Sequence, residues 1–357
     1  MKIIGMLKKV KLQQSLREWD TSGVCLRKKQ GGARTGLAPG GHGGKMDAIR
    51  NNFMPSSFRS GFVAILGRPN VGKSTLTNRL VGHKVSIVTS RPQTTRTRIL
   101  GIVNRPDAQL VLIDTPGIHR DPTALGRQMN AEISQALEGI DVLAVMIDAS
   151  QGLKRADLMA FERAGHFAGP AILLLNKIDR MTKPALLPLL ETCSRQAAFT
   201  EMIPISALSG DGVERVLERL LAYLPEGAPH FPQDQFTDQP ERFLAAEIVR
   251  EKVMAATWHE VPHAVAVRVE SFEDQKGKMR ILATIQTERE SQKGILIGRG
   301  GAQLKEIGTA ARKELEAFFG VKVYLELRVK LERDWRNDPQ RVRQLDWRRQ
   351  LEQMGGE

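Results

Sequence analysis

The run from Gly67 to Ser74, with the sequence GRPNVGKS, has the residue types and spacing of a loop that holds nucleotide phosphates. It follows the aliphatic run 62–66 and precedes a helix-forming segment at 75–81. Backbone N–H groups of such a loop point at anionic oxygens, Lys73 reaches the β- and γ-phosphates, and the Ser74 hydroxyl is placed to ligate Mg²⁺. The spacing therefore predicts a nucleotide site at the end of a strand.

Two later segments can complete a site for Mg²⁺ and the γ-phosphate. Thr95 can bring its hydroxyl to Mg²⁺ when the γ-phosphate is present, and we prefer it to its neighbour Thr94. Asp114 ends an aliphatic run, which places its carboxylate near Mg²⁺, through water, and the Gly117 N–H near the γ-phosphate. The predicted Mg²⁺ ligands are Ser74, Thr95 and Asp114.

The run Asn176-Lys177-Ile178-Asp179 indicates which base is bound. Asp179 can accept hydrogen bonds from the N1–H and the exocyclic amine of guanine, a donor pair that adenine lacks. With ATP bound, the buried carboxylate would lack those donors, which costs free energy. The same carboxylate therefore selects GTP and rejects ATP. A backbone N–H of the pair Ser206 and Ala207 would complete the base pocket.

Each of these signals alone has an ordinary structural explanation, such as a turn at Asn176, a helix cap at Asp114 or a solvated Lys73. Five signals in order, each at a strand end of one sheet, favour GTP binding. The predicted nucleotide-binding residues are Gly67, Asn70, Val71, Gly72, Lys73, Ser74, Thr75, Asp114, Gly117, Asn176, Lys177, Asp179, Ser206 and Ala207.

The means of hydrolysis is less obvious, because Ile118 stands where Ras-like GTPases place a water-orienting glutamine. An aliphatic side chain cannot orient water, so we expect a low intrinsic rate. The side-chain oxygen of Asn70 could help to hold K⁺ against the phosphates; alternatively, Asn70 only stabilises the loop. The predicted catalytic residues are Lys73, Asn70, Thr95 and Gly117.

The 357 residues predict two domains and tails. Aliphatic runs alternate with helical patterns between 61 and 226, which indicates a doubly wound α/β domain. The expected strands after 62–66 are 110–113, 142–147, 171–175 and 203–205, and the expected crossover helices are 156–164, 185–197 and 213–223. Prolines at 229, 232 and 240 mark a linker at 227–240.

Residues 241–335 follow an α+β order, with expected helices at 243–256 and 304–318 and expected strands at 265–272, 279–287 and 321–329. A Gly-x-x-Gly run, Gly298 to Gly301, stands among aliphatic residues before the second helix, as in KH modules. Without Cβ atoms a turn lets a ribose-phosphate backbone approach closely. We expect the aliphatics Ile295, Ile297, Leu304 and Ile307 to line a groove for about four nucleotides. The predicted RNA-binding residues are Lys293, Ile297, Gly298, Arg299, Gly300, Gly301, Lys305 and Arg312.

The net charge of +13 is concentrated in residues 1–60, which carry 12 basic and 3 acidic side chains. We expect this glycine-rich extension to be disordered; it is a flexible tail, an organellar transit segment or the product of a start upstream of Met46 or Met54. Residues 336–357 form a basic tail that contacts RNA or presents a solvated helix face. Cys25 and Cys193 lack metal-ligand spacing, and no apolar run is long enough to span a bilayer.

These motifs together resemble the Era family of bacterial GTPases, from about residue 61 to residue 335. The resemblance implies an α/β P-loop GTPase domain followed by an α+β type II KH domain. It also implies binding to the 3′ end of the small-subunit ribosomal RNA (16S), a role in 30S subunit assembly and maturation controlled by the nucleotide state, and peripheral association with the inner membrane. We expect a cytoplasmic monomer.

Two alternatives belong to other classes of function. One is a GTP-dependent binding module at a membrane surface, with the basic extension as its contact. The other is an ATP-driven RNA remodeller, which Asp179 disfavours because its carboxylate matches guanine.

Overall fold

The computed structural model describes residues 58–348, except residues 120 and 276. The chain divides into two units, Met1–Met54 and Pro55–Glu357, and every described residue belongs to the second unit. The extension predicted at 1–60 therefore falls almost entirely outside the described residues, as does the last part of the tail predicted at 336–357.

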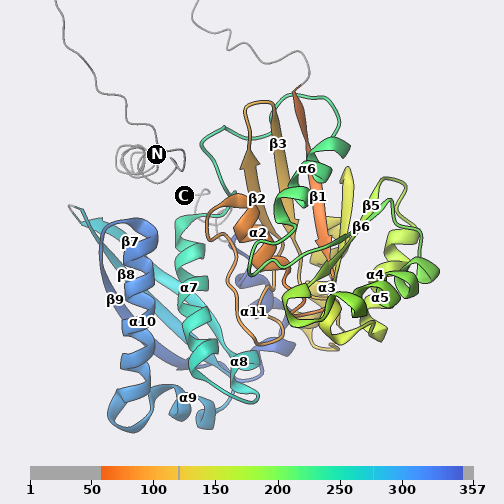
Figure 1. The fold of residues 1–357 in the computed structure, drawn as a ribbon. Helices are drawn as coiled ribbons and strands as arrows, with labels where there is room; N and C mark the ends of the chain where they lie inside the picture. The colour runs from red at the N-terminus through yellow and green to blue at the C-terminus, as the bar shows by residue number, and fades with distance from the viewer. Residues whose placement is uncertain (1–57, 120, 276, 349–357) are drawn as a thin grey trace, which may run out of the picture. The chain divides into compact units, whose positions relative to one another are not determined.

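A six-stranded sheet forms the frame of the first domain (Figure 1). Its strands are β1 (Arg59–Leu66), β2 (Ile99–Asn104), β3 (Ala108–Asp114), β4 (Val142–Asp148), β5 (Ala171–Asn176) and β6 (Glu201–Pro204). They lie in the order β2-β3-β1-β4-β5-β6, and every neighbouring pair is parallel except β2 with β3. All residues of β4 and β5 are buried, which explains why these strands are continuous aliphatic runs.

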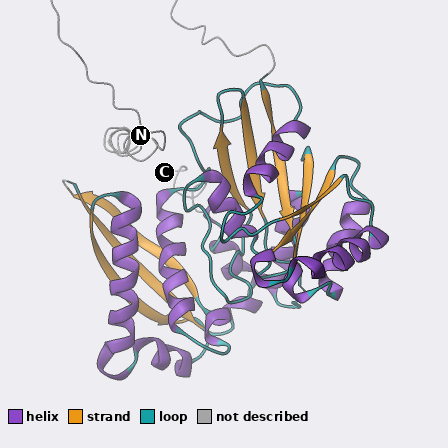
Figure 2. Cartoon of the chain, in the orientation of Figure 1, coloured by secondary structure: helices purple, strands orange, loops and turns teal. Residues whose placement is uncertain are grey.

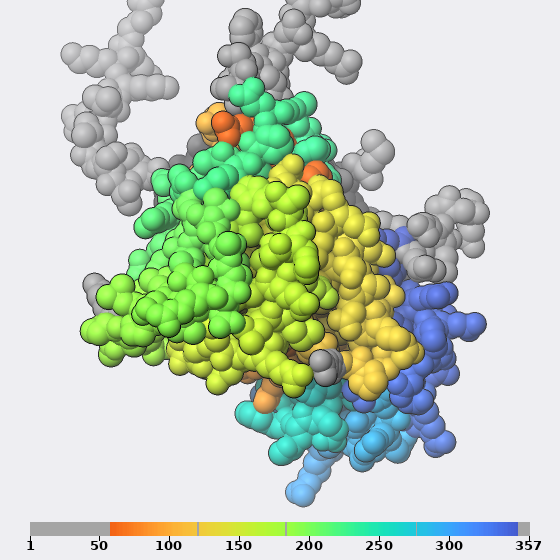
Figure 3. Space-filling model, turned by 90° about the vertical axis from the view of Figure 1, so that its right-hand side faces the viewer, coloured from red at the N-terminus to blue at the C-terminus, as the bar shows by residue number. Residues whose placement is uncertain are grey.

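Helices cover both faces of this sheet, as the purple and orange elements of Figure 2 show. They are α2 (Lys73–Val81), α3 (Ala124–Ala136), α4 (Arg155–Gly165), α5 (Lys183–Gln196) and α6 (Val213–Tyr223), with short turns η1 (Ala149–Gln151) and η2 (Ile178–Arg180). One core includes Leu76 of α2 and Val216 of α6, and the other includes Ile133 of α3 and Phe161 of α4. Figure 3 shows the yellow-to-green face that α4 and α5 help to form. The predicted α/β layout is confirmed.

A three-stranded sheet with helices on one face forms the second domain. Its elements are α7 (Glu241–Ala256), α8 (Val261–Ala264), β7 (Ala266–Gln275), β8 (Lys278–Thr287), α9 (Glu290–Ile297), η3 (Arg299–Gly301), α10 (Ala302–Phe319) and β9 (Lys322–Leu331). β8 pairs antiparallel with β7 and parallel with β9. One core joins Val249 of α7, Ile281 of β8 and Leu315 of α10, and the predicted α+β order is confirmed.

The segments on either side of the second domain both contact the first. Residues 227–240, predicted as a linker, follow the edge of β2, where the Ile102 N–H donates to the Phe236 carbonyl at 2.9 Å. After β9 the chain forms η4 (Trp335–Asn337) and α11 (Pro339–Gln344), whose residues Trp335 and Val342 are buried against Met129 of α3. The described part of the predicted basic tail therefore packs against the first domain through α11.

Candidate functional site

The loop between β1 and α2 has a shape that requires its glycines. Gly72 has a φ of 109°, and a Cβ there would collide with the side-chain amide of Asn176. Lys73 begins α2 and donates from Nζ to the carbonyls of Gly67 (3.1 Å) and Arg68 (3.2 Å), so its ammonium group lies inside the loop. Burial lowers the pKa of Lys73 to about 8, although the nearby Asp114 opposes this effect. A loop of this shape at a helix N-terminus suits an anion.

Three side chains meet beside this loop, and they are the three predicted Mg²⁺ ligands. Ser74 Oγ lies 3.0 Å from Thr95 Oγ1 and donates to Asp114 Oδ2 at 2.7 Å. Asp114 has no exposed surface, and within the described residues its Oδ1 has no hydrogen-bond partner. Burial raises the pKa of Asp114, while Lys73 and the hydroxyl hydrogen bonds oppose the rise. An incompletely paired buried carboxylate beside two hydroxyls fits a hard cation such as Mg²⁺, whose role would be to neutralise charge on the phosphates.

Asn176 ties the phosphate loop to the loop after β6. Its side-chain Nδ2 donates to the Val71 carbonyl at 2.6 Å, and its Oδ1 accepts from the Ala207 N–H at 2.8 Å. Arg79 of α2 adds to this frame by donating from Nε to the Ala207 carbonyl at 2.9 Å. Asp179 in η2 lines the cavity beside these loops, and about a third of its side chain is exposed. Its carboxylate is therefore accessible to a nucleobase.

Lys177 fastens the other side of the phosphate loop. Its backbone is left-handed, with a φ of 68°, and its Nζ donates to the Asn70 carbonyl and to Asp148 Oδ2, both at 2.7 Å. Burial by itself raises the pKa of Asp148, but hydrogen bonds from Lys177 and Ser150 outweigh it and hold that pKa below its usual value. The Lys177 side chain thus connects the phosphate loop to the end of β4.

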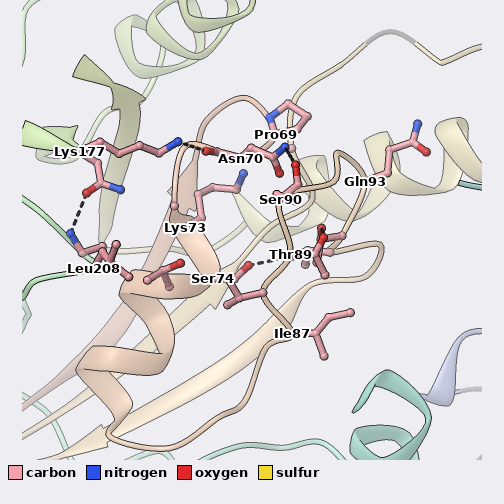
Figure 4. A pocket seen from close by; sticks show the side chains of 18 of the residues that line it. Pro69, Asn70, Lys73, Ser74, Ile87, Thr89, Ser90, Gln93, Lys177 and Leu208 are labelled. Carbon is pink, nitrogen blue, oxygen red and sulfur yellow. Dashed lines mark hydrogen bonds between the residues drawn. The ribbon is translucent and has the colours of Figure 1, made fainter. Parts of the chain in front are cut away.

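These loops surround a cavity of about 440 Å³, which Asn70, Lys73, Ser74 and Thr89 help to line (Figure 4). Most predicted nucleotide-binding residues line it, whereas four do not: Gly67, Val71, Asp114 and Ser206. The sequence analysis missed the lining residues Pro69, Ile87, Val88, Thr89, Ser90, Gln93, Gln151, Arg180 and Leu208. Ser90 and Gln93 could have been found from their closeness to Thr95, but nothing in the sequence points to Gln151.

The segment between α2 and β2, residues 83–98, closes one side of the cavity, and we call it the α2–β2 segment. Asn70 Nδ2 donates to the Ser90 carbonyl at 2.7 Å, which links the phosphate loop to this segment (Figure 4). Thr95 is buried, in keeping with its contact to Ser74. Ile118 is also buried, because its side chain packs in the core that includes Ile133.

The Gly-x-x-Gly loop connects α9 to α10. Gly298, Gly300 and Gly301 have φ values of 70°, 58° and 82°, which side-chain-bearing residues rarely adopt. Nothing lies within 4 Å of a Cβ built on Gly300 or Gly301, so the backbone is open to a ligand there. Arg299 and Lys305 are exposed around this loop.

Other predicted RNA-binding residues lie in different surroundings. Lys293 forms an ion pair with Glu290 at 3.4 Å. Arg312 lies eleven residues along α10 from Gly301, about 16 Å at the rise of an α-helix, and pairs with Glu316 at 3.8 Å. Ile307, one of the four aliphatic residues expected to line a groove, is instead buried in the domain core. Ile297 is half-buried and Ile295 is exposed, so both remain at the surface.

Comparison with known proteins agrees with the fold. A family model for a 50S ribosome-binding GTPase matches residues 62–177, and a KH domain model matches residues 260–336. The chain is therefore a GTPase that carries a KH domain. It is 47% identical over 292 residues to GTPase Era of Syntrophus aciditrophicus, which covers 81% of this chain and 95% of that protein. The chain belongs to the Era family of GTPases and hydrolyses GTP.

Two solved structures are similar along most of the chain. Each has a TM-score of 0.79 and 43% identity, and covers 81% of this chain and 99% of the other. One is a point variant of Era from Aquifex aeolicus bound to GDP and AlF4⁻, and the other is Era with MgGDPNP and nucleotides 1506–1542 of 16S ribosomal RNA. The presence of Mg²⁺ in such a relative supports Mg²⁺ as the cofactor of this GTPase.

Proposed function

We propose that this GTPase binds the 3′ end of the small-subunit ribosomal RNA through its KH domain and acts in assembly and maturation of the 30S subunit. The observation that carries the proposal is the Gly298–Gly301 loop, in which Gly300 and Gly301 have positive φ values and leave an open backbone for a ribose-phosphate chain. The relative bound to 16S ribosomal RNA supports it. In this proposal GTP favours the RNA-binding state, and RNA then raises the affinity for GTP by the same factor.

In this proposal the residues of the cavity keep their predicted roles. Lys73 pairs with the phosphates, while Ser74, Thr95 and Asp114 hold Mg²⁺ and its water. Asp179 accepts from guanine, and Asn176 and Lys177 hold the loops in place for it. The Gly117 N–H contacts the γ-phosphate.

A short RNA that copies the rRNA 3′ end tests the proposal in the full chain. We expect tighter binding to the protein loaded with a non-hydrolysable GTP analogue than to the GDP form, and loss of binding in Gly301→Asp, which adds a side chain and a negative charge where the phosphate backbone would lie. Gly277→Asp is the matched control, because Gly277 also has a φ of 81° and open space but lies in the β7–β8 turn. Equal binding by Gly301→Asp and the wild type would refute the proposal.

We also propose that K⁺ assists hydrolysis through Asn70, and that the intrinsic rate is low because Ile118 is buried. Asn70 spans the phosphate loop and the α2–β2 segment, so a cation held there would lie beside the phosphates. GTP turnover should be faster in potassium than in sodium buffer, and Asn70→Ala should remove the difference without abolishing GDP binding. Identical turnover in the two buffers would rule out the cation.

A cytoplasmic location, a monomeric state and peripheral association with the inner membrane stay predictions from the family resemblance. Within residues 58–348, no helix combines the length and the apolarity needed to cross a bilayer. Cosedimentation with anionic vesicles, before and after deletion of residues 1–55, tests the membrane association.

A further inference from the structure

A large aromatic side chain stands in solvent on the loop between α7 and α8. Trp258 is 65% exposed, whereas Trp335 and Trp347, the other tryptophans that the structure describes, are buried. An indole group can stack on a nucleobase, and exposed aromatic side chains serve this purpose in proteins that bind single-stranded nucleic acid.

Trp258 lies beside the Gly-x-x-Gly loop. The Gln303 side chain at the start of α10 donates to the carbonyl of Ala256, two residues before Trp258, at 3.2 Å. Gln303 also packs under the loop, because a Cβ at Gly298 would lie 2.7 Å from the Gln303 Cβ. The last turn of α7 and the first turn of α10 therefore lie side by side, at the end of the domain where α9 lies in Figure 1.

The orientation of this indole is fixed by a cation from the other domain. Arg91 donates from Nη2 to the Thr257 carbonyl at 3.1 Å, and its guanidinium carbon lies 4.4 Å from the centroid of the Trp258 ring. Such a contact restrains the ring through its π-electrons and holds a positive charge beside it. The next residue, His259, has a φ of 56°, so the backbone turns sharply after the tryptophan.

We propose that Trp258 stacks on a base of the single-stranded RNA whose backbone the Gly298–Gly301 loop holds, with Arg91 orienting the ring and facing the RNA phosphates. This inference rests on the proposed function of the KH domain. RNA is the favoured ligand because an open glycine backbone, exposed Arg299 and Lys305, and an exposed indole lie at one end of one domain. The glycine loop allows the close approach of a ribose-phosphate backbone, which a protein or a lipid surface does not have.

Binding of the short 3′-end RNA by the full chain loaded with a GTP analogue tests this contact. Trp258→Ala should weaken the affinity about tenfold or more, since stacking contributes that much for each base. Trp258→Phe should lose less, because a smaller ring still stacks. Replacing the stacked nucleotide by an abasic one should bring the wild type and Trp258→Ala to the same affinity; a scan of abasic positions identifies that nucleotide.

Tryptophan emission gives a second measurement. RNA should quench the wild-type emission, and most of the quenching should disappear in Trp258→Phe, because the other described indoles are buried. Fluorescent GDP should bind equally to all variants, which shows that the nucleotide site is intact.

The outcomes separate the inference from the function on which it rests. If Gly301→Asp abolishes RNA binding while Trp258→Ala binds as the wild type does and no quenching occurs, the stacking contact is wrong and the proposed function stands. If the wild type does not bind the RNA, or Gly301→Asp binds normally, the function and the contact fail together.

Discussion

At the scale of single residues, Asn176 shows how one side chain joins two functional loops. Its side-chain amide donates to the Val71 carbonyl and accepts from the Ala207 N–H, and the residue is buried. Asn176→Ala leaves these two backbone groups without partners, so we expect a loss of about 1–3 kcal/mol in the free energy of unfolding. The affinity for fluorescent GDP should fall at least tenfold, because the two loops that hold phosphate and base are no longer tied.

Asn104→Ala is the matched control for this variant. Asn104 ends β2 and binds the Gln235 carbonyl at 3.0 Å, well outside the residues that line the cavity. It should lose stability in urea titrations but keep the wild-type affinity for GDP. The same affinity in both variants would show that Asn176 acts only on stability.

Asp238 is a residue whose charge opposes folding. Burial raises its pKa to about 6, although Arg348 opposes the rise, and within the described residues its Oδ1 has no hydrogen-bond partner. The folded state therefore binds the proton more tightly than the unfolded state, and the wild type loses stability as the pH rises from about 4 to about 6. The pKa in the folded state is about two higher than in the unfolded state, and a difference of one in pKa corresponds to about 1.4 kcal/mol. The free energy of unfolding therefore falls by no more than about 3 kcal/mol.

Asp238→Asn should therefore stabilise the protein above pH 6 and lose this advantage below pH 4, where the wild-type carboxyl is neutral. Thermal unfolding at pH 8, 6 and 4 measures the difference. A stabilisation that does not change with pH would mean that the ionisation of Asp238 is not its cause.

At the scale of elements, the segment after β9 holds α3 and the second domain together. Trp335 is buried with Leu125 and Met129 of α3, and its Nε1 donates to the Ala264 carbonyl at 2.9 Å. Trp335→Ala should cost about 3–5 kcal/mol of unfolding free energy by leaving a cavity and an unpaired carbonyl. Urea unfolding followed by circular dichroism measures this cost. Trp258→Ala is the control, with a loss of about 0.5 kcal/mol or less expected at an exposed site.

The sequence predicted elements wherever burial imposes a clear pattern. β4 and β5 are buried aliphatic runs, and α6 spans Val213–Tyr223 as expected because its apolar positions repeat at helical spacing. β2 and α3 were not predicted. β2 is an antiparallel edge strand whose partners include the linker carbonyl of Phe236, a pairing that no local pattern records.

The site divides in the same way. Phosphate and Mg²⁺ chemistry fixes the residue types around Lys73 and Asp114, so their motifs could be read directly from the sequence. Trp258 could not, because its role depends on contacts with Arg91 and Gln303, which lie far from it along the chain. Contacts between residues that only tertiary folding brings together cannot be predicted from the spacing of residues in the sequence.

At the scale of the whole molecule, α7 of the second domain contacts the α2–β2 segment of the GTPase domain. Arg250, which is buried, donates to the carbonyl of Thr94, next to the predicted Mg²⁺ ligand. Glu251 accepts from the Val88 N–H at 2.9 Å and from Lys84 Nζ at 2.6 Å. Lys84 also pairs with Glu314 of α10. Because the same segment lines the nucleotide cavity, a change in its order must change these contacts with the KH domain.

Glu251 is therefore the position at which communication between the two sites is best tested. In the wild type we expect a lower dissociation constant for the 3′-end RNA with the GTP analogue than with GDP. Glu251→Ala frees Val88 and leaves Lys84 with Glu314 alone, so the ratio of the two constants should fall toward one, as a coupling energy of about 1–3 kcal/mol is lost. Glu326→Ala, which removes an exposed pair with Arg328 on β9, should keep the wild-type ratio. If Glu251→Ala keeps it too, the coupling runs through other contacts than this one.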